Sequence, residues 1–529
     1  MLIDSTPAGS GPTAFTSRQA WQIFGTLLFG TFVAIEAAAF QSPALAPITR
    51  HFGIPVSAAA LVLLFYYLGA TVFAPVMGGV ADNIGRKRMV MIGLGVFAAS
   101  EFLAALSPNF SFLLAMRFIQ GLGVACILPV VLAAVSQLFP ADRRGLPLGI
   151  MALAMSLGAT TGALLAGLLI DSFGWPSIYL VSGAAALVGL LLVAIFVPKL
   201  EVGSSDRGID VRGTFLLLLT LGGVLSVPTL AGNFGAGAWP TIAALLIGIG
   251  SAILLWLNSR GRASAVIDTA LLKHREFVVP ALIYMLHLLC YGGAIYSLAF
   301  IVSDRPGGSA ADVGFVNLFV YGASSLAAPI AGRFVDRVDA RYVLIAALLV
   351  MLLGLLAFAQ IDADTPLGVI AAVACLLGLT TGSKTPAIMK IALGAVPPQR
   401  MGRGAGLLTM LRDIGVPAGS SFSLAIYGST VGRRTEQEVF ERATAAGLDQ
   451  QWIPALHKLV ATRGKQVDPA LQEQLSARGL EVADLIQSST AIAISGALPI
   501  VGYVLAGVMV VAIGMACTIR RSAPVGAAV

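Results

Sequence analysis

The chain has 529 residues, of which 57% are hydrophobic and only 11% are charged. Soluble domains carry about 25% charged residues, so this composition excludes an ordinary soluble protein and indicates a membrane protein. The net charge of +7 does not indicate a nucleic-acid partner, because the basic residues sort by side of the membrane.

Apolar runs of about 20 residues, the length that crosses a bilayer as a helix, recur along nearly the whole chain. The N-terminal residues before the first run are polar and mixed. The first run is longer than the apolar core of a signal peptide, so we expect it to remain as a membrane span. The fourteen predicted spans are 21–46, 56–80, 89–106, 110–136, 146–170, 177–197, 213–231, 239–257, 277–301, 312–332, 342–359, 366–394, 404–427 and 492–518.

Basic residues indicate which way the spans run. With the N-terminus in the cytoplasm, the inward loops hold clusters such as Arg86, Lys87 and Arg88, whereas the short outward loops hold only Arg50 and Arg305. This asymmetry follows the positive-inside rule. It predicts that both termini lie in the cytoplasm, as an even number of spans requires.

An internal repeat organises the sequence. The segment APVMGGVADNIGRK, starting at Ala74, matches APIAGRFVDRVDAR, starting at Ala328, so that Asp82 corresponds to Asp336. Parallel halves of this kind are a common transporter construction, with the substrate site between them near the bilayer midplane. We therefore predict an all-α integral membrane protein with two six-helix repeats and two inserted central helices. The predicted domains are 1–199, a linker with the two extra helices at 200–276, and 277–529, which includes an outward-facing helical hairpin at about 428–490.

Motifs of enzymes and cofactors are missing from the sequence. The stretch GLTTGSKTP, from Gly378 to Pro386, lacks the glycine that a phosphate-binding loop needs directly before Lys384, and its repeat partner lies in an apolar run. HExxH and GxSxG are absent. The four cysteines fall within predicted spans, where they pack as small apolar residues. We expect no catalytic site, no cofactor and no metal site.

The loop between the second and third spans resembles the G-x-L-A-D-R-x-G-R-K pattern of the major facilitator superfamily, with Asn83 in place of the usual arginine. With fourteen spans, the chain resembles the drug/proton antiporter branch of that family, and the resemblance covers nearly its whole length. It implies that the loop acts as a conformational latch; the alternative is a simple solvated turn with positive-inside charges. The motif residues are Gly78, Asp82, Gly85, Arg86 and Lys87, with Gly332 and Asp336 in the second copy.

Two further elements resemble the family. Arg117, Gln120, Gly121 and Gly123 match R-x-x-Q-G-x-G, in which the arginine is associated with proton coupling. The alternative is a structural arginine bonded to backbone carbonyls. The fifth span resembles the glycine-proline element of antiporters in degraded form, with Ala159 in the proline position. Its glycines, expected to serve helix packing, are Gly149, Gly158 and Gly162, repeated as Gly406, Gly415 and Gly419.

Ionisable side chains near the bilayer midplane are the candidates for proton coupling, because they are costly there unless they serve a pathway or meet a partner. Asp413 is the first candidate and Glu36 the second, with Arg117 and His287 behind them. For Asp413 the alternative is a permanent ion pair with a basic residue on another helix, since successive helical side chains such as that of Arg412 diverge by about 100°. Glu36 and His287 could equally be structural.

Substrate-cavity candidates lie on the same spans. Lys384 is deep in its span and either pairs with Asp413 or Glu36 or receives an anionic substrate group, whereas Lys390 can extend to the interface. The other candidates are Arg412, Tyr284, Tyr291 and Gln120.

The resemblance implies a proton-driven exporter of amphipathic small molecules or drugs that works by alternating access, as a monomer, in the cytoplasmic (inner) membrane of a bacterium. Its partners would be the substrate, protons and the lipid bilayer, without nucleic acid. The first alternative is a proton-coupled symporter or facilitator for a small anionic metabolite. The second is a non-transporting membrane receptor or scaffold.

Overall fold

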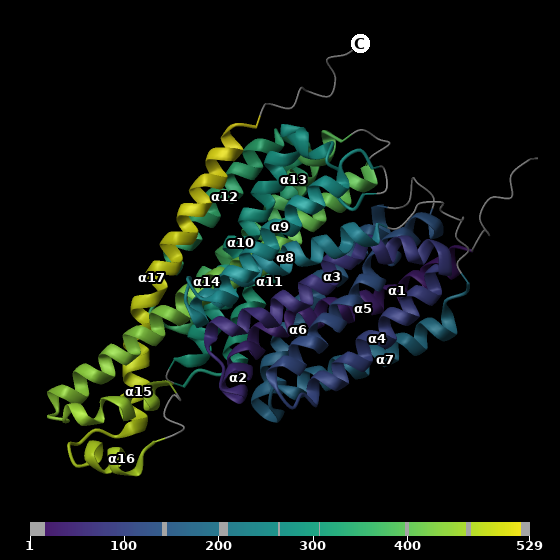
Figure 1. Ribbon diagram of the computed structural model, residues 1–529. Helices are drawn as coiled ribbons and strands as arrows, with labels where there is room; N and C mark the ends of the chain where they lie inside the picture. The colour runs from purple at the N-terminus through teal and green to yellow at the C-terminus, as the bar shows by residue number, and fades with distance from the viewer. Residues whose placement is uncertain are drawn as a thin grey trace, which may run out of the picture.

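The computed structural model describes residues 16–139, 145–199, 210–262, 265–305, 307–396, 401–461 and 467–519. Within these ranges the chain forms α-helices joined by short connections, and no strand is present. The helices lie side by side in one elongated bundle (Figure 1). The N-terminal helices are α1 (Ser17–Ala39), α2 (Gln41–Phe52), α3 (Val56–Ile84), α4 (Arg86–Ala105), α5 (Phe110–Leu138), α6 (Gly145–Phe173) and α7 (Pro176–Phe196).

Two helices follow in the middle of the chain, α8 (Val211–Phe234) and α9 (Trp239–Ser259). The C-terminal helices are α10 (Arg275–Asp304), α11 (Ala310–Arg337), α12 (Ala340–Phe358), α13 (Leu367–Gly394), α14 (Met401–Ala445), α15 (Ile453–Ala461), α16 (Pro469–Ser476) and α17 (Val482–Cys517).

Thirteen helices in the described residues are long and apolar enough to cross a membrane. The fourteenth crossing is α14, which is less apolar because it carries Arg412 and Asp413 side by side. The first predicted span comprises two helices, α1 and α2, which meet at Phe40 with helical backbone angles. The interruption lies where Pro43 cannot donate an N–H to the carbonyl of Ala39. The prediction of an all-α membrane protein is confirmed, and thirteen of the fourteen predicted spans coincide with these helices in the described residues.

Helices α14 and α17 are longer than a membrane crossing requires. With 45 and 36 residues, they measure about 67 and 54 Å, against a hydrocarbon core of about 30 Å. Their excess length joins α15 and α16 in a helical subdomain with its own apolar core, which includes Val439, Leu459 and Leu471. We call this subdomain, residues 428–490, the cap.

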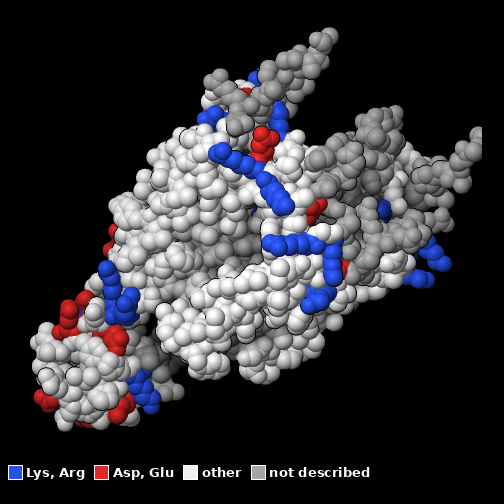
Figure 2. All heavy atoms as spheres, turned by 45° about the horizontal axis from the view of Figure 1, so that its top comes forward, with Lys and Arg blue, Asp and Glu red and all other residues white. Residues whose placement is uncertain are grey.

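The cap lies at one end of the bundle, and α17 runs from it to the opposite end, where the described chain finishes (Figure 1). We call these the cap end and the terminal end. Figure 2 shows charged side chains of both signs on the cap, whereas the long flank of the bundle next to it is almost free of charge. This distribution is the one expected of a bundle whose flank faces lipid.

The helices form an N-terminal and a C-terminal group, which meet along two contacts that we call seams. On the N-terminal side α3 packs on α5, and α4 packs on α5 and α7; on the C-terminal side α10 packs on α14, and α11 packs on α13. The seams between these groups are the α6–α11 and α3–α14 contacts. Helices α8 and α9 pack on each other, and α8 also covers the α3–α14 seam. The domain boundaries at 199 and 276 remain predictions.

Candidate functional site

Asp413 and Arg412 form an ion pair within α14. The Arg412 Nε donates to Asp413 Oδ1 at 2.7 Å, and the side chains are 34% and 24% exposed. The guanidinium of Arg412 also lies close to the hydroxyl of Tyr284 of α10. The partner of the carboxylate is thus its own neighbour, not a basic residue on another helix. The long arginine side chain can fold back across the angle that separates successive helical residues.

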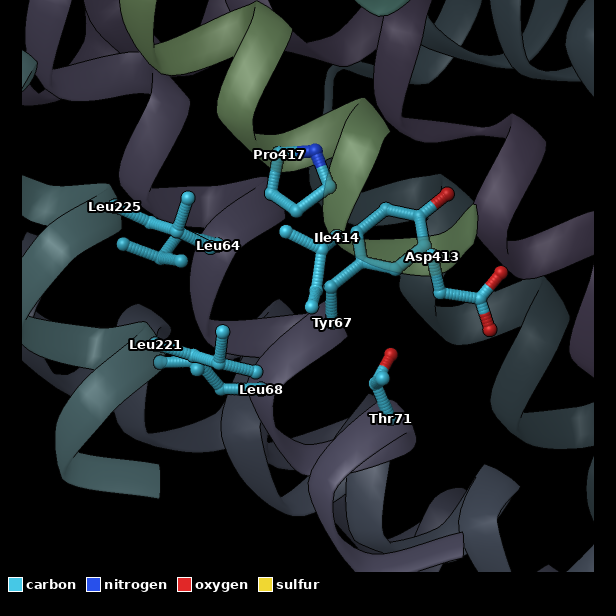
Figure 3. A pocket seen from close by; sticks show the side chains of 9 residues that line it. All are labelled: Leu64, Tyr67, Leu68, Thr71, Leu221, Leu225, Asp413, Ile414 and Pro417. Carbon is cyan, nitrogen blue, oxygen red and sulfur yellow. The ribbon is translucent and has the colours of Figure 1, made fainter. Parts of the chain in front are cut away.

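Asp413 lies at the α3–α14 seam. It borders a small pocket to which α3 contributes Tyr67 and Thr71, and α8 contributes Leu221 and Leu225. In Figure 3 the carboxylate points away from the leucines, and the ring of Tyr67 lies beside it. One wall of the acidic site therefore belongs to the N-terminal group of helices, and an inserted helix separates the site from the flank of the bundle.

Tyrosines from both groups of helices meet next to this pair. Tyr291 of α10 lies close to Tyr321 of α11, and Tyr67 lies within Coulombic range of Asp413, Arg412 and Tyr321. Sequence reasoning selected Tyr284 and Tyr291 but missed the α3 and α11 members. For α3, the only signal in the sequence was the pair of adjacent tyrosines in an apolar span. The full cluster is Tyr66, Tyr67, Tyr291, Tyr296 and Tyr321.

Lys384 is completely buried and has no carboxylate partner among the described residues. Its Nζ donates to the carbonyl of Thr381, in its own helix, at 3.2 Å and lies 5.2 Å from the ring centroid of Tyr284. The ion pair with Asp413 or Glu36 does not form. Lys390 donates from Nζ to the Val335 carbonyl at 2.5 Å and is exposed, as a lysine at the interface would be.

His287 is buried one turn from Tyr284. Its Nε2 is 3.0 Å from the hydroxyl of Thr380, and its Nδ1 has no partner within the described part of the chain. The ring lies within Coulombic range of Lys384. The polar residues of α10, α13 and α14 thus form one group, in which the cations Arg412 and Lys384 outnumber the carboxylate of Asp413.

Glu36 and Arg117 lie in the N-terminal group of helices. Glu36 is 9% exposed, and its carboxylate makes no hydrogen bond with a described residue. Arg117 is fully buried, hydrogen-bonds Gln120 and lies 4.5 Å from the ring centroid of Tyr66. One of its terminal nitrogens has no partner in the described chain, and Glu101, equally buried, lies within Coulombic range. Glu101 is an acidic neighbour that the sequence did not single out.

Four of the helix-packing glycines, Gly158, Gly162, Gly415 and Gly419, occupy close helix contacts. A Cβ on Gly162 would lie 2.8 Å from Cγ of Glu36, and one on Gly158 would lie 3.2 Å from Phe32. Gly415 and Gly419 lie against the backbone of α10, whereas Gly406 has open space. The surroundings of Gly149, in α6, lie outside the described part of the structure.

The loop motif joins α3 directly to α4. Gly85, with φ of 95°, adopts a backbone conformation that only glycine takes readily, and Lys87 donates to the Ala194 carbonyl of α7 at 2.8 Å. Gly332 has open space around it. Arg86 begins α4, and Gly78 lies near Pro129. The side chains of Asp82 and Asp336 lie outside the described part of the structure.

The two groups of helices are joined tightly at the cap end. Asp171, at the end of α6, accepts hydrogen bonds from the N–H groups of Ala310 and Ala311, which begin α11, at 3.0 and 2.8 Å. Farther along the same seam, the backbones of α6 and α11 are in contact. A Cβ on Gly314 would lie 2.6 Å from the Ala163 carbonyl. At the terminal end, Gly332 and Gly406 have open space. The cap end of the α6–α11 seam is therefore closed.

Known proteins resemble the chain along most of its length. It is 26% identical over 442 residues to the riboflavin transporter RibZ of Clostridioides difficile, which covers 83% of this chain and 95% of that protein. It is 28% identical over 405 residues to the multidrug resistance protein Stp of Mycobacterium tuberculosis (76% and 74%), and 28% identical over 381 residues to the methyl viologen resistance protein SmvA of Salmonella typhimurium (71% and 75%).

Solved structures show the same fold. A bacterial homologue of the human lysosomal transporter Spinster, in an inward-facing and unoccupied conformation, superposes with a TM-score of 0.63 at 14% identity, over 96% of this chain and 100% of that one. The nucleoside transporter NupG superposes with a TM-score of 0.56 at 13% identity, over 94% of this chain and 100% of that one. The family model described as Major Facilitator Superfamily matches residues 27–264 and 280–435. The chain belongs to the Major Facilitator Superfamily and is a multi-pass membrane transporter, not an enzyme.

Proposed function

We propose that the protein is a proton-driven exporter of amphipathic small molecules, with Asp413 as its main proton-coupling group. The observation that carries this proposal is the ion pair between Arg412 and Asp413, which is partly exposed at the α3–α14 seam. A coupling carboxylate must be reached by both groups of helices and by water, and the partial exposure of Asp413 and its place beside α3 support this role.

Protonation of Asp413 would remove the negative charge that neutralises Arg412. Arg412 would then remain close to the buried cation of Lys384, within Coulombic range. Repulsion between like charges in a buried site is costly, so the protonated and deprotonated forms would favour different helix arrangements. That difference is what alternating access requires. On the N-terminal side, Arg117 and Glu101 form a second polar pair, and Glu36 lies beside Gly162 of α6; either position could share in the coupling.

The tyrosine cluster supports an amphipathic substrate. Tyrosine offers an aromatic face to an apolar body and a hydroxyl to a polar group. Tyr291 and Tyr321 come from the C-terminal side, and Tyr66 and Tyr67 from the N-terminal side. A molecule bound among them would touch both groups of helices. The names of Stp and SmvA, a multidrug and a methyl viologen resistance protein, are consistent with export.

The positive-inside charges support an orientation with the terminal end in the cytoplasm and the cap outside. Closure of the cap end through Asp171 would then make this an inward-facing form, in the cytoplasmic membrane of a bacterium. The loop at Gly85 and Lys87 would act as a latch at the cytoplasmic end in the opposite state. Moving one charge across 100 mV supplies about 2.3 kcal/mol, so one or two protons per cycle can sustain a useful gradient.

A second candidate function is proton-coupled symport of an anionic metabolite, and Lys384 is the observation that favours it. A buried cation without a carboxylate partner would suit the anionic group of a substrate. The two functions predict opposite proton movements. In an exporter the proton and the substrate compete, whereas a protonated Asp413 would raise the positive charge of the site and so favour binding of an anion.

Inside-out membrane vesicles loaded with acid test the proposal. The substrate panel would contain methyl viologen, riboflavin and a fluorescent aromatic carboxylate, with vesicles that lack the protein as control. We expect at least one compound to enter the vesicles and release protons from them. Substrate entry without proton release would refute proton antiport. Proton release on efflux of the carboxylate from the vesicles would favour the symporter, and no transport of any kind would favour a receptor or scaffold.

A further inference from the structure

A groove runs along the flank of the bundle between α11 and α12, with α13 as its floor. It exists because these two successive helices each pack on α13 and hardly on each other. The volume of the groove is about 490 Å³, within the range of roughly 300–1,000 Å³ typical of small-molecule sites. Its lining residues include Ala331, Phe334, Ala346, Val350 and Leu379.

The shape and lining of the groove fit a hydrocarbon chain. The α11 side extends from Ala327 to Val338, which corresponds to about 16 Å of helix. That length matches one leaflet of a hydrocarbon core about 30 Å thick. Alanines form the hollow, while Phe334 and Tyr342 stand at its edges with 55% and 48% of their surfaces exposed. The only polar groups in the lining are the hydroxyls of Tyr342 and Ser383.

Basic residues gather where the groove reaches the terminal end of the bundle. Arg333 and Arg337 project from the last turns of α11 and are exposed. Lys390 lies on α13 two turns beyond Ser383, on the same face, and its Nζ reaches the Val335 carbonyl of α11. Arg341, at the start of α12, is directed to the Cys517 carbonyl of α17. Asp339 is the N-cap residue of α12, and its side chain accepts a hydrogen bond from the N–H of Arg341 at 3.0 Å.

We propose that this groove binds an anionic phospholipid, with an acyl chain between α11 and α12 and the headgroup phosphate at Arg337 and Lys390. An apolar groove that ends at a cluster of cations has the charge and polarity distribution of such a lipid. Basic pockets between transmembrane helices are known to bind anionic headgroups. Each cation near the membrane surface attracts anionic lipid by about 1 kcal/mol. The proposal does not depend on the transported substrate or on proton coupling.

Native mass spectrometry of the purified full-length protein tests the proposal, with phosphatidylglycerol and phosphatidylcholine added in detergent as competing probes. We expect the wild-type protein to retain phosphatidylglycerol preferentially. The double variant Arg337→Gln and Lys390→Gln should reduce that preference by roughly tenfold or more, as loss of two such cations implies. The matched control is Arg260→Gln with Arg262→Gln, which removes two exposed cations at the same end but just after α9, away from the groove.

A second variant addresses the apolar part of the groove. Ala346→Trp fills the hollow without altering charge and should weaken retention of both lipids. An unchanged preference in the charge variant, or an equal loss in the α9 control, would refute the headgroup assignment. Unchanged retention in Ala346→Trp would refute the acyl-chain assignment. A dimer in the mass spectrum that Ala346→Trp dissociates would show that a second copy of the chain covers the groove instead.

Discussion

Arg412 and Asp413 are successive residues of α14, and the arginine Nε donates to the carboxylate at 2.7 Å. Asp413 borders a pocket that is also lined by residues of α3 and α8. An ion pair within a single helix would not by itself respond to the movement of other helices, but here Tyr284 of α10 lies next to Arg412. Any movement of α10 or α3 relative to α14 would therefore alter the surroundings of the pair.

Replacing Lys384 by methionine should stabilise the folded protein. A buried cation without an acidic partner is costly, and substitution of buried charges by apolar residues of similar size often stabilises by about 1–4 kcal/mol. We expect a higher midpoint of thermal unfolding in detergent, with Lys273→Met, at an exposed lysine before α10, as control. If the symporter is correct, Lys384→Met also abolishes transport of anions. A lower midpoint would show that Lys384 holds the helices together.

Replacing Asp171 by alanine should favour opening at the cap end. The variant removes two hydrogen bonds from a carboxylate to backbone N–H groups of α11. Because Asp171 is exposed, we expect a shift of only about 1 kcal/mol, roughly fivefold in the ratio of the two states. Spin labels at Phe173 and Asp364, with Cys517 replaced by serine, would report the distance between the two groups of helices. An unaltered distance distribution would show that Asp171 does not hold the seam.

Gly314 and Gly322 provide a matched pair on α11. A Cβ on Gly314 would meet the Ala163 carbonyl at 2.6 Å, whereas one on Gly322 would meet nothing within 4 Å. Gly314→Ala should therefore hinder closure at the cap end and slow transport. Gly322→Ala should leave transport unchanged and stabilise the helix by up to about 1 kcal/mol. Equal transport rates in the two variants would contradict the role of the α6–α11 contact.

Sequence reasoning predicted the fourteen spans, because apolar length is a local property that the bilayer imposes on each helix. It could not predict that Arg412 turns back to Asp413, since that depends on which way a long side chain bends among its neighbours. The position of Lys384 was predicted as deep, but its lack of an acidic partner depends on how α13 rotates against α10 and α14. The α3 tyrosines were missed because their role arises only when the two groups of helices meet.

The structure of the cap, too, was predicted from the sequence only in part. Charged and helix-forming residues predicted a helical segment at about 428–490, but the sequence did not show that α14 and α17 continue into it without a break. Leu471→Ala, in the core of the cap, should destabilise this subdomain by about 2–5 kcal/mol while transport continues. Faster cleavage by added protease would reveal the change, with the more exposed Ile453→Ala as control. Loss of transport in Leu471→Ala alone would show that the cap takes part in the cycle.

The role of Asp413 in proton coupling is measured by adding an exported substrate to acid-loaded inside-out vesicles. Proton release is then compared between wild type and Asp413→Asn. The asparagine keeps the size of the side chain but cannot bind or release the proton, and Asp364→Asn, in an exposed loop, is the control. We expect proton release from wild type and from the control, and none from Asp413→Asn, with all three proteins present at equal levels in the membrane. Undiminished proton release from Asp413→Asn would contradict the account.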